Sequence, residues 1–435
     1  MKAFMATGPI GPTARTFARP AVCAVVRQHV DDLAALRLMR AMWVRAPHVR
    51  MLNLRRIDGR IAAHMDGVLA AGATGRKLCV EALATPGVGE VFGIAAVLLE
   101  SLPEHFGPLV ALAQRSPDAR RGLLSAFGWS NSVTRLQPLR RLDGVRDASV
   151  RALAICGYRV LGCTTTKLPM TLHDDLDPQI RTSLARAAGE LGMLSALPAV
   201  LEWTTDSDIA VAFHAVRTAC LLGAAERVGE QLRRFHAKRS PWLEPALALS
   251  LLSAKFVEAR DVLRRMEATA AEISQRQLIR ASGWVGDPLR IPALIDLMAN
   301  PRFARVAGEA FSLITGVDMA YLDLDRKPPK EPISGPTDDP ASDDVALDED
   351  ESLPWPDPQR IKAWWHANAD RFPPGQRYFC GAPPTPEHAL HVLKTGFQRQ
   401  RALAAIWRCV LQPGTPLFNI AAPAWRQEAE LAALS

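Results

Sequence analysis

The feature that most constrains the fold of this chain is a helix-sized unit that returns about every 30 residues. In three consecutive units an aspartate is followed 15 positions later by a glycine. These pairs are Asp147 and Gly162, Asp177 and Gly192, and Asp208 and Gly223. The series continues at Gly286 and Gly316, after a degenerate unit at Leu251–Ala254. Such a period predicts a chain of similar units that pack mainly on their neighbours.

Each unit carries the start and stop signals of an α-helix. An aspartate before an apolar stretch accepts hydrogen bonds from the first free amides of a helix. A glycine adopts the left-handed backbone that ends the helix about four turns later. Second helices follow, for example at 196–201 and 291–298. A hairpin of this size cannot bury its apolar face alone, so we predict an all-α solenoid of stacked hairpins, with a non-repetitive helical bundle as the alternative.

The repeated motif resembles the short type of HEAT-like repeat. That motif combines an Asp, a Val or Ile followed by Arg, and a closing Leu-Gly, as in Asp147, Val150-Arg151 and Leu161-Gly162. The match covers 147–317. Proteins with this repeat include scaffolds, chaperones and enzymes, so the resemblance implies a shape rather than an activity.

Changes in composition divide the chain into four predicted regions. These are an N-terminal Arg-rich helical region (1–75), the HEAT-like solenoid (76–325), an acidic Pro-rich linker (326–356) and a small, Trp-rich, mostly helical C-terminal module (357–435). The linker includes residues 338–351, which hold eight carboxylates and no Lys or Arg. We predict that it is extended and mobile, because it cannot bury enough apolar surface to order itself. One hypothesis is that this acidic run occupies a basic groove when no partner is bound.

The charge balance and the tryptophans indicate where a partner would bind. The whole chain carries +7, and without the acidic run the rest would carry about +15. Arginines crowd the first helices, and five of the ten tryptophans lie at or after Trp355. The predicted partner-binding residues are Arg40, Arg45, Arg55, Arg56, Trp364, Trp365, Arg399, Arg401, Trp425 and Arg426.

The sequence contains no motif that predicts a catalytic, cofactor or metal site. His388 and His391 have ligand-capable spacing, but no third ligand lies nearby in the sequence. His64 lies on an apolar helical face and is expected to be a core histidine. The seven cysteines are far apart, which indicates a reducing compartment. No apolar leader or long apolar run occurs, so we expect a cytoplasmic protein without a membrane partner.

Segments from both ends of the chain extend the resemblance. The stretches Ala63–Gly67, Gly308–Gly316, Gly375–Tyr378, Gln398–Arg401 and Pro423–Gln427 resemble a family of bacterial HEAT-repeat proteins encoded among type VI secretion genes. The resemblance implies a non-catalytic protein-binding scaffold, an adaptor or chaperone that loads a spike, spike-tip or effector protein. It supplies no catalytic residues.

The alternative function is nucleic-acid binding. HEAT-like glycosylases that remove alkylated bases from DNA use a basic concave face with aromatic residues and an Asp. The chain has a basic surplus and tryptophans in or near the repeats, at Trp129, Trp203, Trp242 and Trp284. The same tryptophans also fit as core side chains between helices.

Overall fold

The computed structural model describes residues 22–101, 106–129, 136–142, 144–163, 177–236, 241–268, 275–329 and 348–434. These residues are almost entirely α-helical, which confirms the predicted all-α class. Their only strands are β1 (Asp325–Arg326) and β2 (Trp355–Pro356), which pair antiparallel. Short 3-10 turns lie at Leu194–Ala196, Trp203–Thr205, Ala225–Arg227, Pro288–Arg290 and Ala369–Arg371.

The described helices form two rows. In the first row each helix packs against the next one along the chain. This row consists of α4 (Val88–Ser101), α6 (Pro117–Trp129), α8 (Ala148–Leu161), α9 (Pro178–Glu190), α11 (Ile209–Leu221), α13 (Leu243–Ser253), α15 (Gln275–Val285) and α17 (Ala304–Thr315). Each second-row helix packs on the first-row helix that follows it. This row consists of α3 (Gly72–Ala82), α5 (Phe106–Arg115), α7 (Leu136–Arg140), α10 (Leu197–Glu202), α12 (Gly229–Arg234), α14 (Phe256–Ala268) and α16 (Ile291–Leu297).

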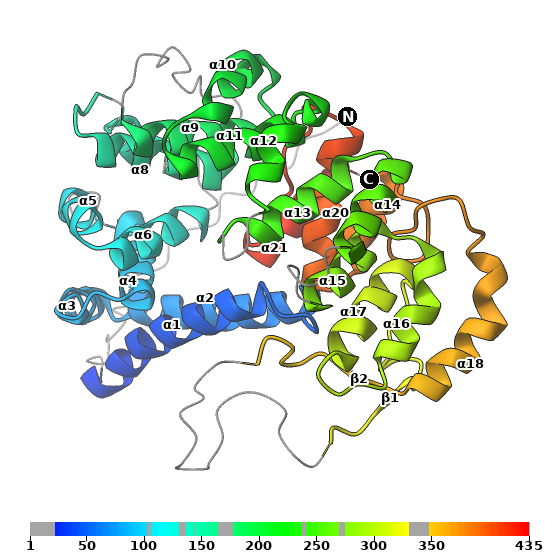
Figure 1. Ribbon diagram of the computed structural model, residues 1–435. Coiled ribbons are helices and arrows are strands. Elements are labelled where there is room, and N and C mark those ends of the chain that lie inside the picture. The colour runs from blue at the N-terminus through cyan, green and yellow to red at the C-terminus, as the bar shows by residue number, and fades with distance from the viewer. Residues whose placement is uncertain are drawn as a thin grey trace, which may run out of the picture.

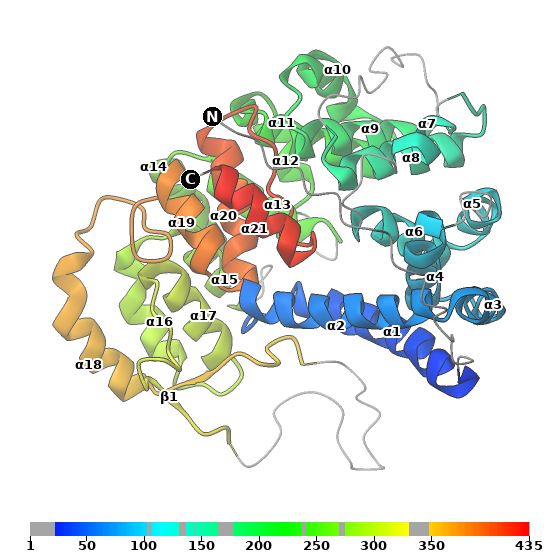
Figure 2. The ribbon, with the colours of Figure 1, turned by 180° about the vertical axis from the view of Figure 1, so that it is seen from behind.

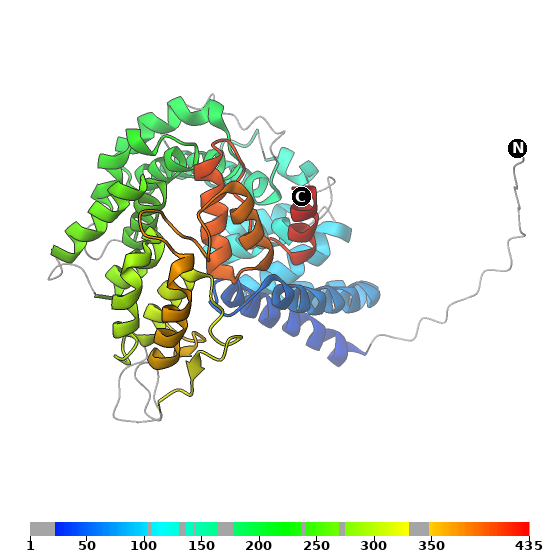
Figure 3. The same cartoon turned by 90° about the vertical axis from the view of Figure 1, so that its right-hand side faces the viewer.

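Further helices lie at both ends of the rows and beside them. The helices α1 (Cys23–Trp43) and α2 (Met51–Ala70) pack on α3 and α4, and α18 (Pro358–Asn368) packs on α16. The rows follow a curve, and α20 (Gln398–Leu411) and α21 (Ala424–Ala433) lie on its inner side (Figures 1 and 2). There α20 packs on α11, α13 and α19 (Pro386–Thr395), while α21 packs on α2. Figure 3 shows these C-terminal helices surrounded by the rest of the chain.

The capping residues predicted from the repeat are confirmed. The carboxylate of Asp147 accepts a hydrogen bond from the Val150 amide at 3.0 Å, and Asp177 and Asp208 cap α9 and α11 in the same way. The repeat glycines all adopt positive φ, from +68° at Gly162 to +84° at Gly223. The local signals therefore end the first-row helices where the sequence indicates.

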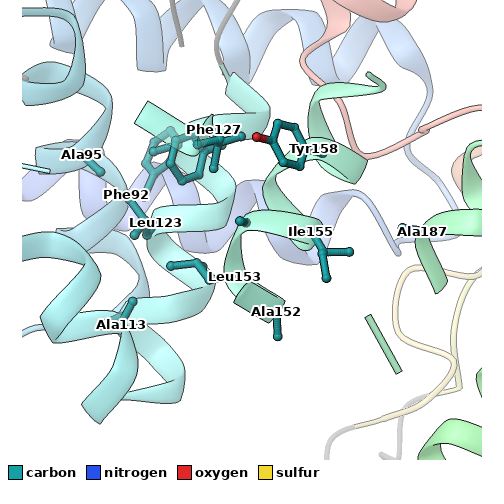
Figure 4. Close-up of a cluster of buried hydrophobic side chains, with 14 of the residues drawn as sticks. Phe92, Ala95, Ala113, Leu123, Phe127, Ala152, Leu153, Ile155, Tyr158 and Ala187 are labelled. Atoms are coloured by element: carbon teal, nitrogen blue, oxygen red, sulfur yellow. The ribbon is translucent and has the colours of Figure 1, made fainter. Parts of the chain in front are cut away.

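Neighbouring helices share a continuous apolar core. One cluster of buried hydrophobic residues extends from Val26 in α1 to Leu249 in α13. Figure 4 shows part of it, where side chains of α4, α6 and α8, including Phe92, Phe127 and Tyr158, point toward one another. Each helix thus buries apolar surface against the helices before and after it.

The chain after α18 contacts the ends of several first-row helices: residues 377–380 contact α13, α15 and α17, and residues 417–426 contact α9 and α8. The Cys380 amide donates to the Leu313 carbonyl at the end of α17, and the Tyr378 amide to the Gly286 carbonyl after α15. Further on, the Leu417 amide donates to the Glu190 carbonyl at the end of α9, at 2.9 Å. The last carbonyls of a helix have no partner inside the helix. Residues 377–426, here called the return segment, therefore cap the first-row helices.

At two of the repeat positions, a glycine is required for two reasons. Its backbone is left-handed, and the main chain of the return segment passes too close for a side chain. A Cβ atom on Gly286 would lie 2.0 Å from the carbonyl oxygen of Tyr378, and one on Gly192 would lie 2.3 Å from that of Gly414. Any other residue would push the return segment away from the helix ends.

Candidate functional site: an arginine-lined cleft

A cleft lies where three distant parts of the chain meet: the turn after α1, helices α13 to α17, and the start of α20. It consists of two hollows of about 410 and 390 Å³ that share Glu309, Leu313 and Arg399. The first hollow is lined by Pro47, His48, Glu309, Ser312, Leu313, Val317, Asp318, Met319, Ala320, Tyr321, Ser352, Leu353, Pro354, Phe397, Arg399 and Gln400. The second is lined by Arg45, Glu244, Arg280, Trp284, Val306, Glu309, Ala310, Leu313, Arg399, Ala402 and Leu403.

The two hollows differ in character. Apolar side chains dominate the first, and among them Tyr321 is 85% exposed to solvent. Arg45, Arg280 and Arg399 line the second hollow together with Glu244. An apolar floor with charged groups at its edge is the composition of many binding sites for proteins and peptides.

The boundary between the hollows is fixed by an ion pair. The Nη1 atom of Arg399 donates to both carboxylate oxygens of Glu309, at 3.0 and 3.1 Å. The Nε atom of Arg399 also donates to the carbonyl of Arg45, at 3.2 Å. Arg399 therefore ties the start of α20 to α17 and to the turn after α1, so the return segment helps to shape the cleft.

Residues 348–353, here called the acidic turn, lie beside the cleft. The Asp350 amide donates to the side chain of Asp348 at 3.0 Å, and the Leu353 amide donates to the Asp350 carbonyl at 2.9 Å. The carboxylate of Asp348 lies 2.7 Å from Arg305. The carboxylates of residues 348–350 face α15 and α17.

Three arginines from two first-row helices hold the carboxylates of the acidic turn. Arg276 of α15 binds Asp350, and its Nε atom donates to Glu349 at 2.8 Å. Arg280, one helical turn later, donates to both carboxylate oxygens of Glu244 at 2.9 Å and also lies 3.5 Å from Glu349. Arg305 also donates to the main-chain carbonyl of Asp350, at 3.0 Å. The site thus recognises both carboxylates and a peptide carbonyl.

Burial strengthens this network. Asp350 is only 3% exposed and Arg305 only 8%. Burial opposes the charge on Arg276, but the hydrogen bonds and charges of Asp350 and Glu349 outweigh it and raise the pKa of Arg276. The guanidinium of Arg305 also stacks on the Trp355 ring, 4.7 Å from its centroid.

The acidic turn corrects the prediction of a mobile linker for residues 348–356. Arginine partners and the β1–β2 pairing hold these residues in place, and neither was visible from local composition. Leu353 is also buried. Residues 330–347, which hold the rest of the predicted acidic run, lie outside the described residues.

The structure brings only Arg45 and Arg399 of the predicted partner-binding residues to the cleft. Arg55 and Arg56 are exposed on α2, where Arg55 faces Glu428 at 3.4 Å. Trp364 and Trp365 pack on Phe372, and the half-buried Trp425 lies in α21.

Arg40, Arg401 and Arg426 are held inside the structure, which corrects the expectation that they form an exposed cluster. Arg40 is 6% exposed, lies 2.5 Å from Asp58 and donates to the Ala421 and Ala422 carbonyls. Arg401 is fully buried and donates to the Leu393 carbonyl at 2.7 Å, and burial lowers its pKa to about 10. Arg426 is half-buried and caps α8 at the Val160 carbonyl. These arginines join the return segment to the helices.

The predicted residues do not include Arg280 and Glu309, which line the cleft, or Arg276 and Arg305, which hold the acidic turn beside it. Nothing in the local sequence separates them from the charges of an ordinary solvated helix face. The acidic run was an indirect signal, because it implied that basic groups elsewhere would face it.

Other clusters of polar side chains in the described part of the chain have structural roles. Among the described residues, no three or more His, Cys, Asp or Glu side chains are grouped as metal ligands would be. His388 contacts the Phe379 carbonyl, and the predicted core residue His64 lies 3.0 Å from His29. Glu190 is surrounded by Arg159, Arg186 and Arg217.

The comparisons with known proteins add no relative. No protein family, curated protein or solved structure matches the chain. In the part that the structure describes, no helix combines the length and the apolar character needed to cross a membrane.

Proposed function

We propose that this protein is a non-catalytic scaffold that binds a partner protein in the arginine-lined cleft, and that its helices form a HEAT-like solenoid. The observation that carries this proposal is that three distant parts of the chain build one cleft in which a mainly apolar hollow adjoins a hollow lined by charged residues. Helical-repeat proteins use extended, curved surfaces of this kind to hold partners.

The proposed role is that of an adaptor or chaperone in the bacterial cytoplasm. The partner is a spike, spike-tip or effector protein of a type VI secretion system. This part of the proposal rests on the resemblance seen in the sequence. The cleft supports the general class, because a large aromatic ring at the edge of a hollow is a frequent anchor for a partner protein.

Nucleic-acid binding is the weaker candidate. Trp203 is 7% exposed, and the partly buried Trp242 and Trp129 pack on Phe213 and Phe92, so three of the four tryptophans considered for base binding lie in or against the core. Trp284 lines the second hollow, where Arg280 and Arg399 are already paired with Glu244 and Glu309. The arginine site fits a short run of carboxylates better than a long polyanion.

An affinity pull-down with mass spectrometry tests the proposal. The bait is the full chain, compared with Arg45→Ala/Tyr321→Ala, which removes two exposed groups of the cleft. The control is Arg121→Ala/Val80→Ala, which removes one exposed arginine on α6 and one exposed apolar side chain on α3.

We expect a spike, spike-tip or effector protein to be recovered by the wild type and the control, and to be lost with the cleft variant. Recovery that is equal for both variants would contradict the proposed cleft. Recovery of nucleic acid alone, with a steep loss of binding as salt increases, would favour the second candidate.

A further inference from the structure

The acidic turn is bound to the rest of the protein in the manner of a short acidic peptide. Its carboxylates at 348, 349 and 350 all face arginines of α15 and α17. Arg305 also donates a hydrogen bond to the peptide backbone, at the Asp350 carbonyl, at 3.0 Å. A polypeptide supplies adjacent carboxylates together with a main-chain carbonyl, so this geometry favours a polypeptide ligand.

The residues of the acidic turn that follow its carboxylates indicate which residue type a bound peptide should carry after its own acidic stretch. Leu353 is 8% exposed and lies in the wall of the first hollow with Leu313 and Met319. An acidic stretch that is followed within a few positions by an aliphatic residue therefore fits both the arginines and the apolar hollow.

The acidic turn does not use the whole capacity of the site. The Nε atom of Arg305 is buried and has no hydrogen-bond partner among the described residues. The side chain of Glu349 remains 65% exposed while it faces Arg276 and Arg280. Another segment with better-placed acceptors would gain contacts that the turn does not make.

We propose that the site formed by Arg276, Arg280 and Arg305 binds an acidic segment of the partner that is followed by an aliphatic residue, and that residues 348–353 are its internal occupant. This inference rests on the proposed function and names the part of the partner that is recognised. The partner segment must displace the turn. Only molecules in which the turn is released can bind the partner segment. The apparent affinity of the protein for that segment is therefore the affinity of the open site multiplied by the small fraction of such molecules.

Fluorescence anisotropy with a labelled synthetic peptide of residues 348–354 tests the inference on the full chain. The first variant, Asp348→Asn/Glu349→Gln, weakens the internal occupant. The matched control is Glu351→Gln, which removes an exposed carboxylate of the same turn for which the described residues offer no ion pair. A third variant adds Arg276→Gln and Arg280→Gln to the first and removes the site.

We expect the peptide to bind the first variant at least about tenfold more tightly than the wild type or the Glu351→Gln control. Binding should weaken as salt rises and should be lost in the third variant. Equal affinity for the wild type and the first variant, binding that survives in the third variant, or tighter binding of an equally charged oligonucleotide would overturn the inference.

Two further measurements keep the result interpretable. Circular dichroism and urea unfolding check that each variant is folded, and Glu349→Gln alone is a milder version of the first variant because that side chain is largely exposed. If the cleft-dependent partner is recovered from extract but the peptide does not compete with it, the proposed function stands and this inference fails. If the peptide binds as expected but the pull-down yields no partner, the proposed function fails.

Discussion

Substituting a repeat glycine tests how the return segment is held on the helix ends. Gly286 has a φ of +70°, and its carbonyl accepts the Tyr378 amide at 2.8 Å. In Gly286→Ala, the new methyl group would lie 2.0 Å from the Tyr378 carbonyl oxygen, so the backbone of the return segment must move. A glycine with the same backbone but no such neighbour is the natural control. Gly72, with a φ of +55°, has no atom within 4 Å of the added carbon.

The expected losses of stability differ between the two variants. The left-handed backbone alone costs about 1 to 2 kcal/mol in either alanine variant. Gly286→Ala should also lose the Tyr378 hydrogen bond and loosen the buried Arg377, which donates to the Leu251 and Leu252 carbonyls. At about 1 kcal/mol for each of these three hydrogen bonds, the total for Gly286→Ala is about 4 to 5 kcal/mol.

Urea unfolding followed by tryptophan fluorescence measures this difference. Gly286→Ala should unfold at a clearly lower urea concentration than Gly72→Ala, and limited proteolysis should cut its return segment first. If both variants unfold at the same urea concentration, the close approach does not contribute to stability and the reasoning is refuted.

Three further predictions concern buried ionisable groups. Glu190→Gln should lower the free energy of unfolding by about 3 kcal/mol, because three arginines lose a largely buried partner. Glu428→Gln, at an exposed ion pair, should change it little, and urea unfolding measures both variants. Burial lowers the pKa of His214 to about 4, so the unfolded chain binds more protons between pH 6.5 and 4. As the pH falls from 6.5 to 4, the melting temperature should therefore fall, and the free energy of unfolding should decrease by up to about 3 kcal/mol. A melting temperature that does not change over this range would contradict the prediction. Burial raises the pKa of the Cys220 thiol to about 12, whereas Cys23 is exposed. A thiol reagent should therefore label Cys23 in the native protein and Cys220 only after unfolding, and peptide mass spectrometry identifies the labelled residue.

The parts of the fold that could be predicted from the sequence depend on local chemistry. Asp147 caps a helix through an amide three residues away, and Gly162 ends the same helix by its own backbone preference. Such interactions involve neighbours in the chain, so the type and spacing of the residues are enough to predict them.

The cleft depends on contacts between residues that are distant in the sequence. Arg40 binds a carbonyl 381 positions away, and Arg276 binds a carboxylate 74 positions away. An arginine on a helix looks the same in the sequence whether it faces water or a distant carbonyl. The predicted surface arginines therefore included two that are buried, Arg40 and Arg401, while Arg276, Arg280 and Arg305 were missed.

The proposed cleft exists only if the return segment is fixed on the first-row helices, and hydrogen exchange measured by mass spectrometry tests this directly. The amides of Tyr378, Cys380 and Leu417 donate to carbonyls at the ends of α15, α17 and α9. Peptides that contain these amides should exchange as slowly as peptides from the first-row helices themselves. Exchange within seconds, as in an exposed loop, would show that the segment is not held and would contradict the proposed cleft.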